Sequence, residues 1–139
     1  MTNEIKYFSR NANELPMIFH FLNAVMKENA SNIKLLNELK LSVEEIFMNM
    51  VRHNKTTNKD IAIRIETHKN SISISLIDHE DNPFDILDTD EIDFDEYFKQ
   101  KKFGGLGIHL IKKLMDDLIF DHNAGKTTIK ITKYINRDV

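Results

Sequence analysis

The stretch that decides the fold is Lys101–Asp117, which reads KKFGGLGIHLIKKLMDD. The chain has only four glycines, and three of them lie here, at positions 104, 105 and 107. Apolar residues then recur at helical spacing, at Ile108, Ile111, Leu114, Met115 and Leu118. The stretch therefore predicts a glycine-rich turn that opens a helix.

Such a turn is suited to phosphate binding. Glycine tolerates positive φ and lets a ligand approach the backbone. A helix N-terminus adds free N–H groups and a partial positive charge, and Lys101 and Lys102 precede the turn. The turn matches neither the P-loop nor the Rossmann pattern, because no Lys-Ser pair follows it and no strand directly precedes it. A short glycine cluster is a weak motif, so a tight loop before an ordinary surface helix remains the alternative.

Length and composition indicate one soluble domain. A chain of 139 residues can bury a real core, and 41% hydrophobic and 29% charged residues are ordinary for a globular protein. The absence of cysteine excludes disulfides and thiolate metal sites and fits a cytoplasmic location. A net charge of −3 argues against nucleic-acid binding, and no apolar run is long enough for a membrane span.

Hydrophobic periodicity predicts the remaining elements. The predicted strands are 5–9, at a sheet edge, then 61–66, 72–77, 118–122 and 128–134. The predicted helices run from 15 to about 28–31, over 33–53 with a break near 40–42 left open, and over 105–117. The turn at 123–126 contains Gly125, which is free to take a positive φ.

This order of elements predicts the fold class. Helices are grouped rather than alternating singly with strands, which indicates α+β: a two-layer α/β sandwich whose mixed, mostly antiparallel sheet has helices on one face. We expect a single domain over residues 1–139. The connection at about 86–103 is long, charged and aromatic, and its place before the glycine turn suggests a lid.

A polar row lies beside the apolar stripe of the predicted helix at 33–53. Ser42, Glu45, Asn49 and His53 share one arc at 100° per residue. The row suits the rim of a pocket, although spacing alone favours a solvated helix flank. Asn49 offers an oxygen suited to Mg²⁺ between phosphates. Glu45, one turn away, could take a proton from a hydroxyl or a water.

A carboxylate follows the second strand of the predicted hairpin. Asp78 stands where that strand reaches the end of the sheet, and its side chain can accept a hydrogen bond from an amino group such as that of adenine. An acidic loop without a role is the alternative. The six histidines show no metal-ligand spacing, so zinc is not expected.

Together these pieces resemble the GHKL-type ATP-binding superfamily, whose fold is that of histidine-kinase-like ATPases. Within it the chain is similar to the anti-sigma factor/serine-protein kinase group of bacterial partner-switching systems. The resemblance covers about residues 36–135 and rests on the order and spacing of several motifs. These are Val43–Asn49 with His53, Pro83–Asp85, Gly104–Ile108, Leu114–Asp116 and the closing strand Thr128–Tyr134.

The resemblance implies a site for Mg-ATP under a mobile lid. It makes Asn49 the Mg²⁺ ligand and Glu45 the catalytic base, and it puts Thr128 near the adenine. The phosphates would contact the glycine turn, chiefly at Gly105 and Gly107. The full set of cofactor-binding residues that we expect is Asn49, Asp78, His79, Lys102, Gly104, Gly105, Leu106, Gly107 and Thr128.

The resemblance also implies a function. Members of this group phosphorylate a serine or threonine of a small anti-anti-sigma (STAS-type) protein, sequester a sigma factor and commonly form homodimers. We therefore expect an ATP-binding anti-sigma factor that is also a protein-serine/threonine kinase. A non-enzymatic GHKL-like switch that sequesters a sigma factor or STAS protein is the alternative. A histidine-kinase catalytic domain fits less well, because the lid is short and no phosphoacceptor helix precedes it.

One segment departs from the family pattern. The family has Asp-x-Gly after the second hairpin strand, whereas this chain reads DHEDNPF at 78–84, without glycine. Alignment without a gap moves the adenine-binding position to His79 and the glycine to Asp81. A one-residue insertion keeps Asp78, and the alternation over Ile72–Ile77 favours the insertion. The added carboxylates are expected to weaken ATP binding.

Overall fold

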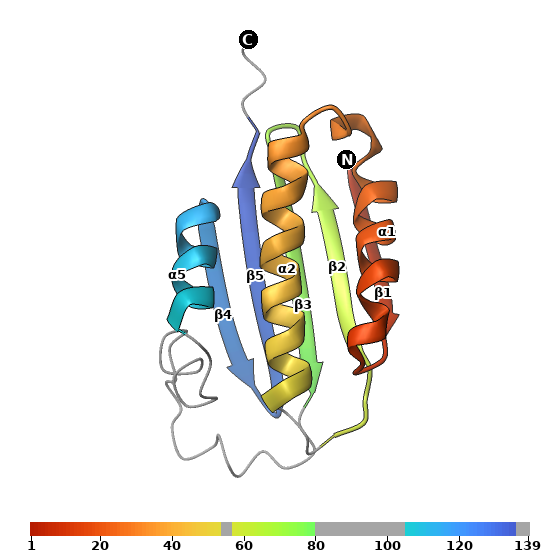
Figure 1. Cartoon of the computed structure of the whole chain (residues 1–139), viewed down its shortest axis with the longest axis vertical. Coiled ribbons are helices and arrows are strands. Elements are labelled where there is room, and N and C mark those ends of the chain that lie inside the picture. The colour runs from red at the N-terminus through yellow and green to blue at the C-terminus, as the bar shows by residue number, and fades with distance from the viewer. Residues whose placement is uncertain (54–56, 80–104, 136–139) are drawn as a thin grey trace.

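The computed structural model describes residues 1–53, 57–79 and 105–135. Its strands form one sheet in the order β1-β2-β3-β5-β4, and the helices cover one face of that sheet (Figure 1). The strands are β1 Thr2–Phe8, β2 Ile61–Thr67, β3 Ser71–His79, β4 Asp117–Asn123 and β5 Lys126–Tyr134. The helices are α1 Leu15–Val25, α2 Ile33–His53 and α5 Gly105–Leu114, with short 3₁₀ turns at Ala12–Glu14 and Lys27–Asn29.

Every pair of neighbouring strands among these five is antiparallel. The predicted α+β sandwich with helices on one face is therefore confirmed, with no parallel pair in the part of the chain described here. The edge position of β1 and the β2–β3 hairpin are confirmed as well. None of the described helices combines the length and the apolar character that a bilayer crossing would need.

The core lies between α2 and the inner face of the sheet. Alternate residues of β2, β3 and β5 point toward the helices and are buried, as expected for an antiparallel sheet with one covered face. The apolar stripe of α2 packs on them. Each fully buried Leu, Ile or Phe contributes about 1.5–3 kcal/mol relative to an exposed one. The stripe residues Leu39, Val43, Ile46, Phe47 and Met50 all have 0% exposure.

The structure corrects two predicted helix ends and settles one open point. The first helix, α1, ends at Val25 rather than near 28–31. The break left open near residues 40–42 does not occur, because α2 is continuous and the stripe on both sides of this segment is anchored in the core. The third helix, α5, ends at Leu114 rather than at 117, because the chain already joins the sheet there. The amide of Asp116 donates to the carbonyl oxygen of Thr132 at 2.9 Å.

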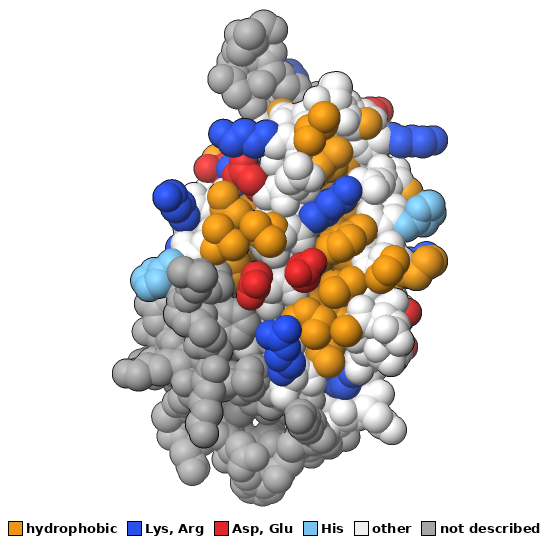
Figure 2. All heavy atoms as spheres, viewed as in Figure 1, with side chains coloured by type: hydrophobic (Ala, Val, Ile, Leu, Met, Phe, Trp, Pro, Cys, Tyr) orange, Lys and Arg blue, Asp and Glu red, His pale blue; other side chains and the backbone are white. Residues whose placement is uncertain are grey.

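The helical face carries mixed side chains. Figure 2 shows acidic side chains over the middle of α2, with hydrophobic side chains gathered on both sides of that helix. Met17 and Leu41 are 49% and 40% exposed on α1 and α2. Apolar surface therefore continues from the core onto the outside of the helical layer.

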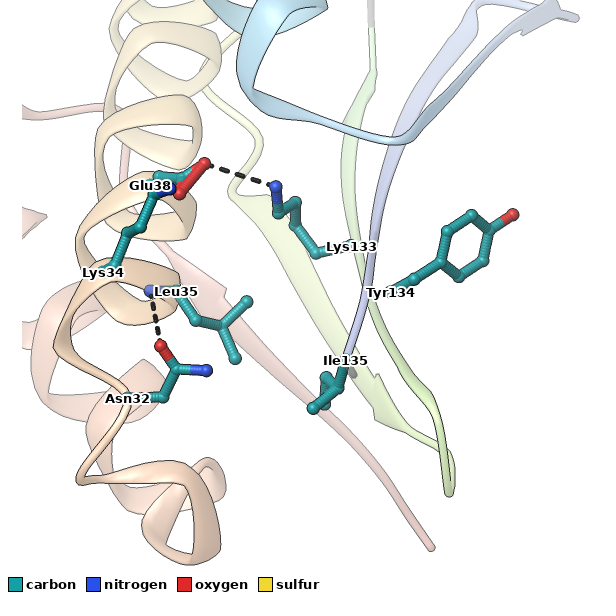
Figure 3. Close-up of a pocket in the computed structure, with 7 residues that line it drawn as sticks. All are labelled: Asn32, Lys34, Leu35, Glu38, Lys133, Tyr134 and Ile135. Carbon is teal, nitrogen blue, oxygen red and sulfur yellow. Dashed lines mark hydrogen bonds and ion pairs between the residues drawn. The ribbon is translucent and has the colours of Figure 1, made fainter. Parts of the chain in front are cut away.

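Lys133 ties three elements together at the end where α2 begins (Figure 3). Its Nζ donates to Glu38 Oε2 of α2 at 3.2 Å and to the carbonyl oxygen of Leu114, the last residue of α5, at 2.7 Å. A cation at the C-terminal end of a helix also interacts favourably with the helix dipole. Nearby, Asn32 Oδ1 accepts the amide of Leu35 at 3.1 Å and caps α2.

Replacing Lys133 with methionine is expected to lower the free energy of unfolding by about 1–3 kcal/mol, the range for hydrogen bonds to charged groups. Methionine keeps the apolar stem but leaves Glu38 and the carbonyl of Leu114 without their donor. Urea unfolding followed by circular dichroism measures the change. Lys130→Met, on the other face of β5, is the matched control and should change stability by less than about 0.5 kcal/mol. Equal effects of the two substitutions would contradict this role of Lys133.

The β4–β5 turn confirms the predicted turn at 123–126. Ala124 has a φ of 54° and Gly125 a φ of 75°, so both central residues are left-handed, as in a type I′ hairpin turn. Glycine adopts this conformation without strain, whereas alanine does so at a cost of about 1–2 kcal/mol.

We therefore expect Ala124→Gly to raise the free energy of unfolding by about 0.5–1 kcal/mol, since part of the relief is offset by the entropy of an unfolded glycine. Gly125→Ala should lower it by about 1–2 kcal/mol. Thermal or urea unfolding of both variants measures these two changes in the free energy of unfolding. A fall in stability on Ala124→Gly would show that Ala124 is not strained.

Candidate functional site

Several of the predicted site residues that the structure describes, among them Asn49, Asp78 and Gly105, belong to elements that meet at one end of the sheet. β1, β3 and α2 end there, and β5 and α5 begin there (Figure 1). The register confirms the strand directions, because Phe8 lies opposite Ile61 and His79 lies opposite Lys126. The hollow of about 220 Å³ around Lys133 lies at the other end and contains none of the predicted site residues (Figure 3).

Ser42 and Asn49 of α2 are fully buried polar residues. Within the described ranges, neither Oδ1 nor Nδ2 of Asn49 has a hydrogen-bond partner, and Ser42 Oγ has none either. Buried polar groups are normally paired, and each unpaired one costs about 1–3 kcal/mol. The solvated-flank alternative is therefore wrong for Ser42 and Asn49. Glu45 is only partly buried, and the side chain of His53 lies outside the described residues.

Asn49 fits a magnesium ligand. Its amide oxygen is a hard donor without a protein partner in the described structure. Mg²⁺ usually keeps several waters and takes only one or two oxygens from the protein besides those of phosphates. No group of three or more His, Asp or Glu side chains gathers into a metal site among the described residues. The donor set therefore fits a metal shared with phosphates and not a cage built from protein alone.

Asp78 is fully buried near the end of β3. By alternation it faces the helices, on the same side as Ile74 and Leu76. Arg10, in the loop after β1, donates from Nη2 to Asp78 Oδ1, and the two side chains are 9% and 0% exposed. The contact joins residues 68 positions apart in the sequence. Asp78 is therefore buried on the inner face of the sheet and paired with a cation that the sequence analysis did not anticipate.

His79 points the other way. It follows Asp78 on β3, lies opposite Lys126, and is only partly buried. Burial lowers the pKa of His79, and the charges of Lys59, Lys126 and Arg10 lower this pKa further. Because Asp78 faces inward and His79 outward, the strand register favours the alignment in which Asp78 keeps the adenine-binding position.

The predicted Thr128 and its neighbour Thr127 lie on opposite faces of β5. Thr128 lies opposite Ile77 on the outer face, so the sheet does not bring it to Asp78. Thr127 lies opposite Asp78, is fully buried, and its Oγ1 lies 2.7 Å from His122 Nδ1. Strand alternation could have placed Thr127 on the inner face, because it lies two residues before Ile129 and four before Ile131, which are core residues. No local sequence pattern predicts the position of Arg10.

The glycine turn is described only from Gly105 onward. Gly105, Leu106 and Gly107 form the first turn of α5, so the predicted helix start is confirmed. Lys102, Gly104 and the predicted lid at 86–103 lie outside the described residues. So does the segment 80–85 that carries the departure from the family pattern.

Comparison with known proteins identifies the family. The profile of the histidine kinase-like ATPase domain family matches residues 8–133. The chain belongs to this family. The serine-protein kinase RsbW of Bacillus velezensis is 30% identical over 108 residues, which cover 73% of this chain and 66% of that protein. RsbW of Staphylococcus aureus strain JH9 is 32% identical over 110 residues, covering 74% and 68%. The chain thus spans about two thirds of the length of these kinases, and the resemblance drawn from the sequence is confirmed.

Solved structures confirm the fold. The RsbU and RsbW domains of a Mycobacterium tuberculosis protein superpose with a TM-score of 0.67 at 15% identity, covering 96% of this chain and 32% of that one. A SiaB–SiaC complex from Pseudomonas aeruginosa gives a TM-score of 0.59 at 12% identity, covering 95% and 89%. At these identities the likeness concerns the fold alone.

Acidification is expected to destabilise the protein through His79. Its pKa in the folded chain is lowered, whereas the unfolded chain titrates near 6.5. The unfolded state therefore binds more protons below pH 6.5, and the stability that is fully present above pH 6.5 is lost as the pH falls toward the folded pKa. We expect the loss between pH 7.5 and 5.5 to be smaller in His79→Gln than in the wild type, measured by urea unfolding. His20→Gln, on the exposed side of α1, is the control and should lose as much free energy of unfolding over this pH range as the wild type. If His79→Gln also loses as much as the wild type, His79 is not a source of the pH dependence.

Proposed function

We propose that the chain binds Mg-ATP at this end of the sheet and transfers the γ-phosphate to a serine or threonine of a STAS-type anti-anti-sigma protein, while also sequestering a sigma factor. The observation that carries the proposal is Asn49, which is fully buried with both amide atoms unpartnered in the described structure. The RsbW relatives, which are named serine-protein kinases, support the reaction class.

Each residue of the site has a role in this proposal. Asn49 Oδ1 would hold a Mg²⁺ ion, which would neutralise charge on the phosphates during transfer. Glu45 lies one turn before Asn49 and remains partly exposed, so its carboxylate can reach an incoming hydroxyl and accept the proton. The backbone N–H groups at the start of α5, at Gly105, Leu106 and Gly107, would bind phosphate. Lys102 and Gly104 would complete that turn.

The base would be bound at the end of β3. Asp78 would accept a hydrogen bond from the 6-amino group of adenine. Thr127 takes the position first given to Thr128, because Thr127 shares the inner face with Asp78. His79, on the outer face, would contact the nucleotide only from the side of the sheet opposite to Asp78.

A non-catalytic switch is the second candidate, and one observation favours it. Asp78 is already paired with Arg10, and a paired carboxylate is less free to accept the amino group of adenine. In that case the chain would hold a sigma factor or STAS protein without phosphorylating it.

We also propose that the protein is a cytoplasmic homodimer, as the resemblance implies. Light scattering of the purified chain measures its mass in solution. A monomer at micromolar concentration would contradict the dimer.

Calorimetric titration with Mg-ATP separates the two candidates. We expect the wild type to bind and Asn49→Ala to bind at least about tenfold more weakly, because it loses the proposed metal ligand. No heat at millimolar ATP would contradict the kinase and leave the switch.

Substitution of Glu45 tests the chemistry. Glu45→Gln should keep ATP binding and lower phosphate transfer to a STAS protein by about 10²–10⁴-fold, the usual contribution of a general base. Glu44→Gln, at the adjacent position of α2, is the matched control and should retain transfer. Unchanged transfer in Glu45→Gln would remove Glu45 as the base.

A further inference from the structure

Arg10 has more hydrogen-bonding capacity than its ion pair uses. Its guanidinium group carries five N–H donors in a rigid planar fork. Nη2 donates to Asp78, but Nε and Nη1 are buried and have no acceptor in the described part of the chain. The side chain is only 9% exposed, so bulk solvent has little access to these donors.

Neutralising Asp78 does not explain this geometry. An arginine that serves only to balance a buried carboxylate commonly pairs side by side, through two nitrogens. Here one nitrogen is bonded and two others are left over. Leaving buried donors unpaired costs about 1–3 kcal/mol each, and more for charged groups. Such a cost is tolerated where a ligand supplies the acceptor, and this loop borders the proposed adenine position at Asp78.

We propose that Arg10 and Asp78 read the purine ring together. Asp78 accepts a hydrogen bond from the 6-amino group, and Arg10 donates to the ring nitrogen beside that group. Adenine presents its amino donor between two acceptors, N1 on one edge and N7 on the other. A carboxylate next to a guanidinium is the complement of an amino group next to a ring nitrogen. This inference rests on the proposed ATP binding and assigns a specificity-determining residue to it.

Nucleotides that lack one ring nitrogen test the proposal. We compare the binding of Mg-ATP, Mg-1-deaza-ATP and Mg-7-deaza-ATP by calorimetry, because each analogue keeps the amino group and lacks one acceptor. The wild type should bind one of the two analogues at least about tenfold more weakly than ATP, as expected for the loss of a hydrogen bond to a charged donor. The analogue that loses affinity identifies the edge that Arg10 reads.

Substitution of Arg10 completes the test. In Arg10→Met the dissociation constant of the affected analogue should exceed that of ATP by less than about threefold. This holds even if both affinities drop because the ion pair between Arg10 and Asp78 is lost. A merely structural role would weaken all three nucleotides equally and leave the ratio unchanged. Arg10→Lys keeps a cation beside Asp78 but lacks the planar guanidinium fork. If the methionine variant does not fold, the ratio of dissociation constants is expected to fall in the lysine variant in the same way. Arg64→Met, on β2, is the matched control and should keep the wild-type ratio.

The outcomes separate the two proposals. If the wild type does not bind ATP, the proposed nucleotide site fails and the inference fails with it. If the wild type binds ATP and both deaza analogues equally well, or if a folded Arg10 variant keeps the tenfold ratio, ATP binding stands and the role of Arg10 is overturned.

Discussion

The packing of α2 on the inner face of the sheet is the constraint on which the rest of the structure depends. Its apolar stripe and the inward isoleucines of β2, β3 and β5 form one core. Close packing of this stripe fixes the rotation of α2 about its axis, so the helix cannot turn to expose a single buried side chain to solvent. Ser42 and Asn49 flank the stripe, so the packing that stabilises the domain also buries them.

The two ends of the sandwich differ in how their polar side chains are paired. Where α2 begins, Lys133 satisfies Glu38 and the last carbonyl of α5, and Asn32 caps the helix. Where α2 ends, Asn49 and Arg10 keep polar atoms for which the described residues offer no partner. Buried polar groups are costly unless paired, so their concentration at one end points to a ligand there. Paired polar side chains hold one end of the domain together, and the other end is where we propose that the nucleotide binds.

Charge at the site end is arranged in two layers by the alternation of β3. Asp78 faces inward, where Arg10 meets it, and His79 faces outward, where burial and then nearby cations lower its pKa. A shift of one residue in register would exchange these faces. The strand therefore decides which of two adjacent ionisable residues faces the proposed nucleotide site.

Local patterns determined most of the architecture. Period-two alternation predicted the hairpin strands, helical spacing predicted α2 and its polar row, and the glycine cluster predicted the start of α5, because these signals depend only on near neighbours. Tertiary structure alone decided the rest. The ion pair between Arg10 and Asp78 spans 68 residues, and the pairing of Thr127 rather than Thr128 with Asp78 depends on the register between β3 and β5. Long-range contacts of this kind have no local signature, because they arise only when the strands align and the core closes over them.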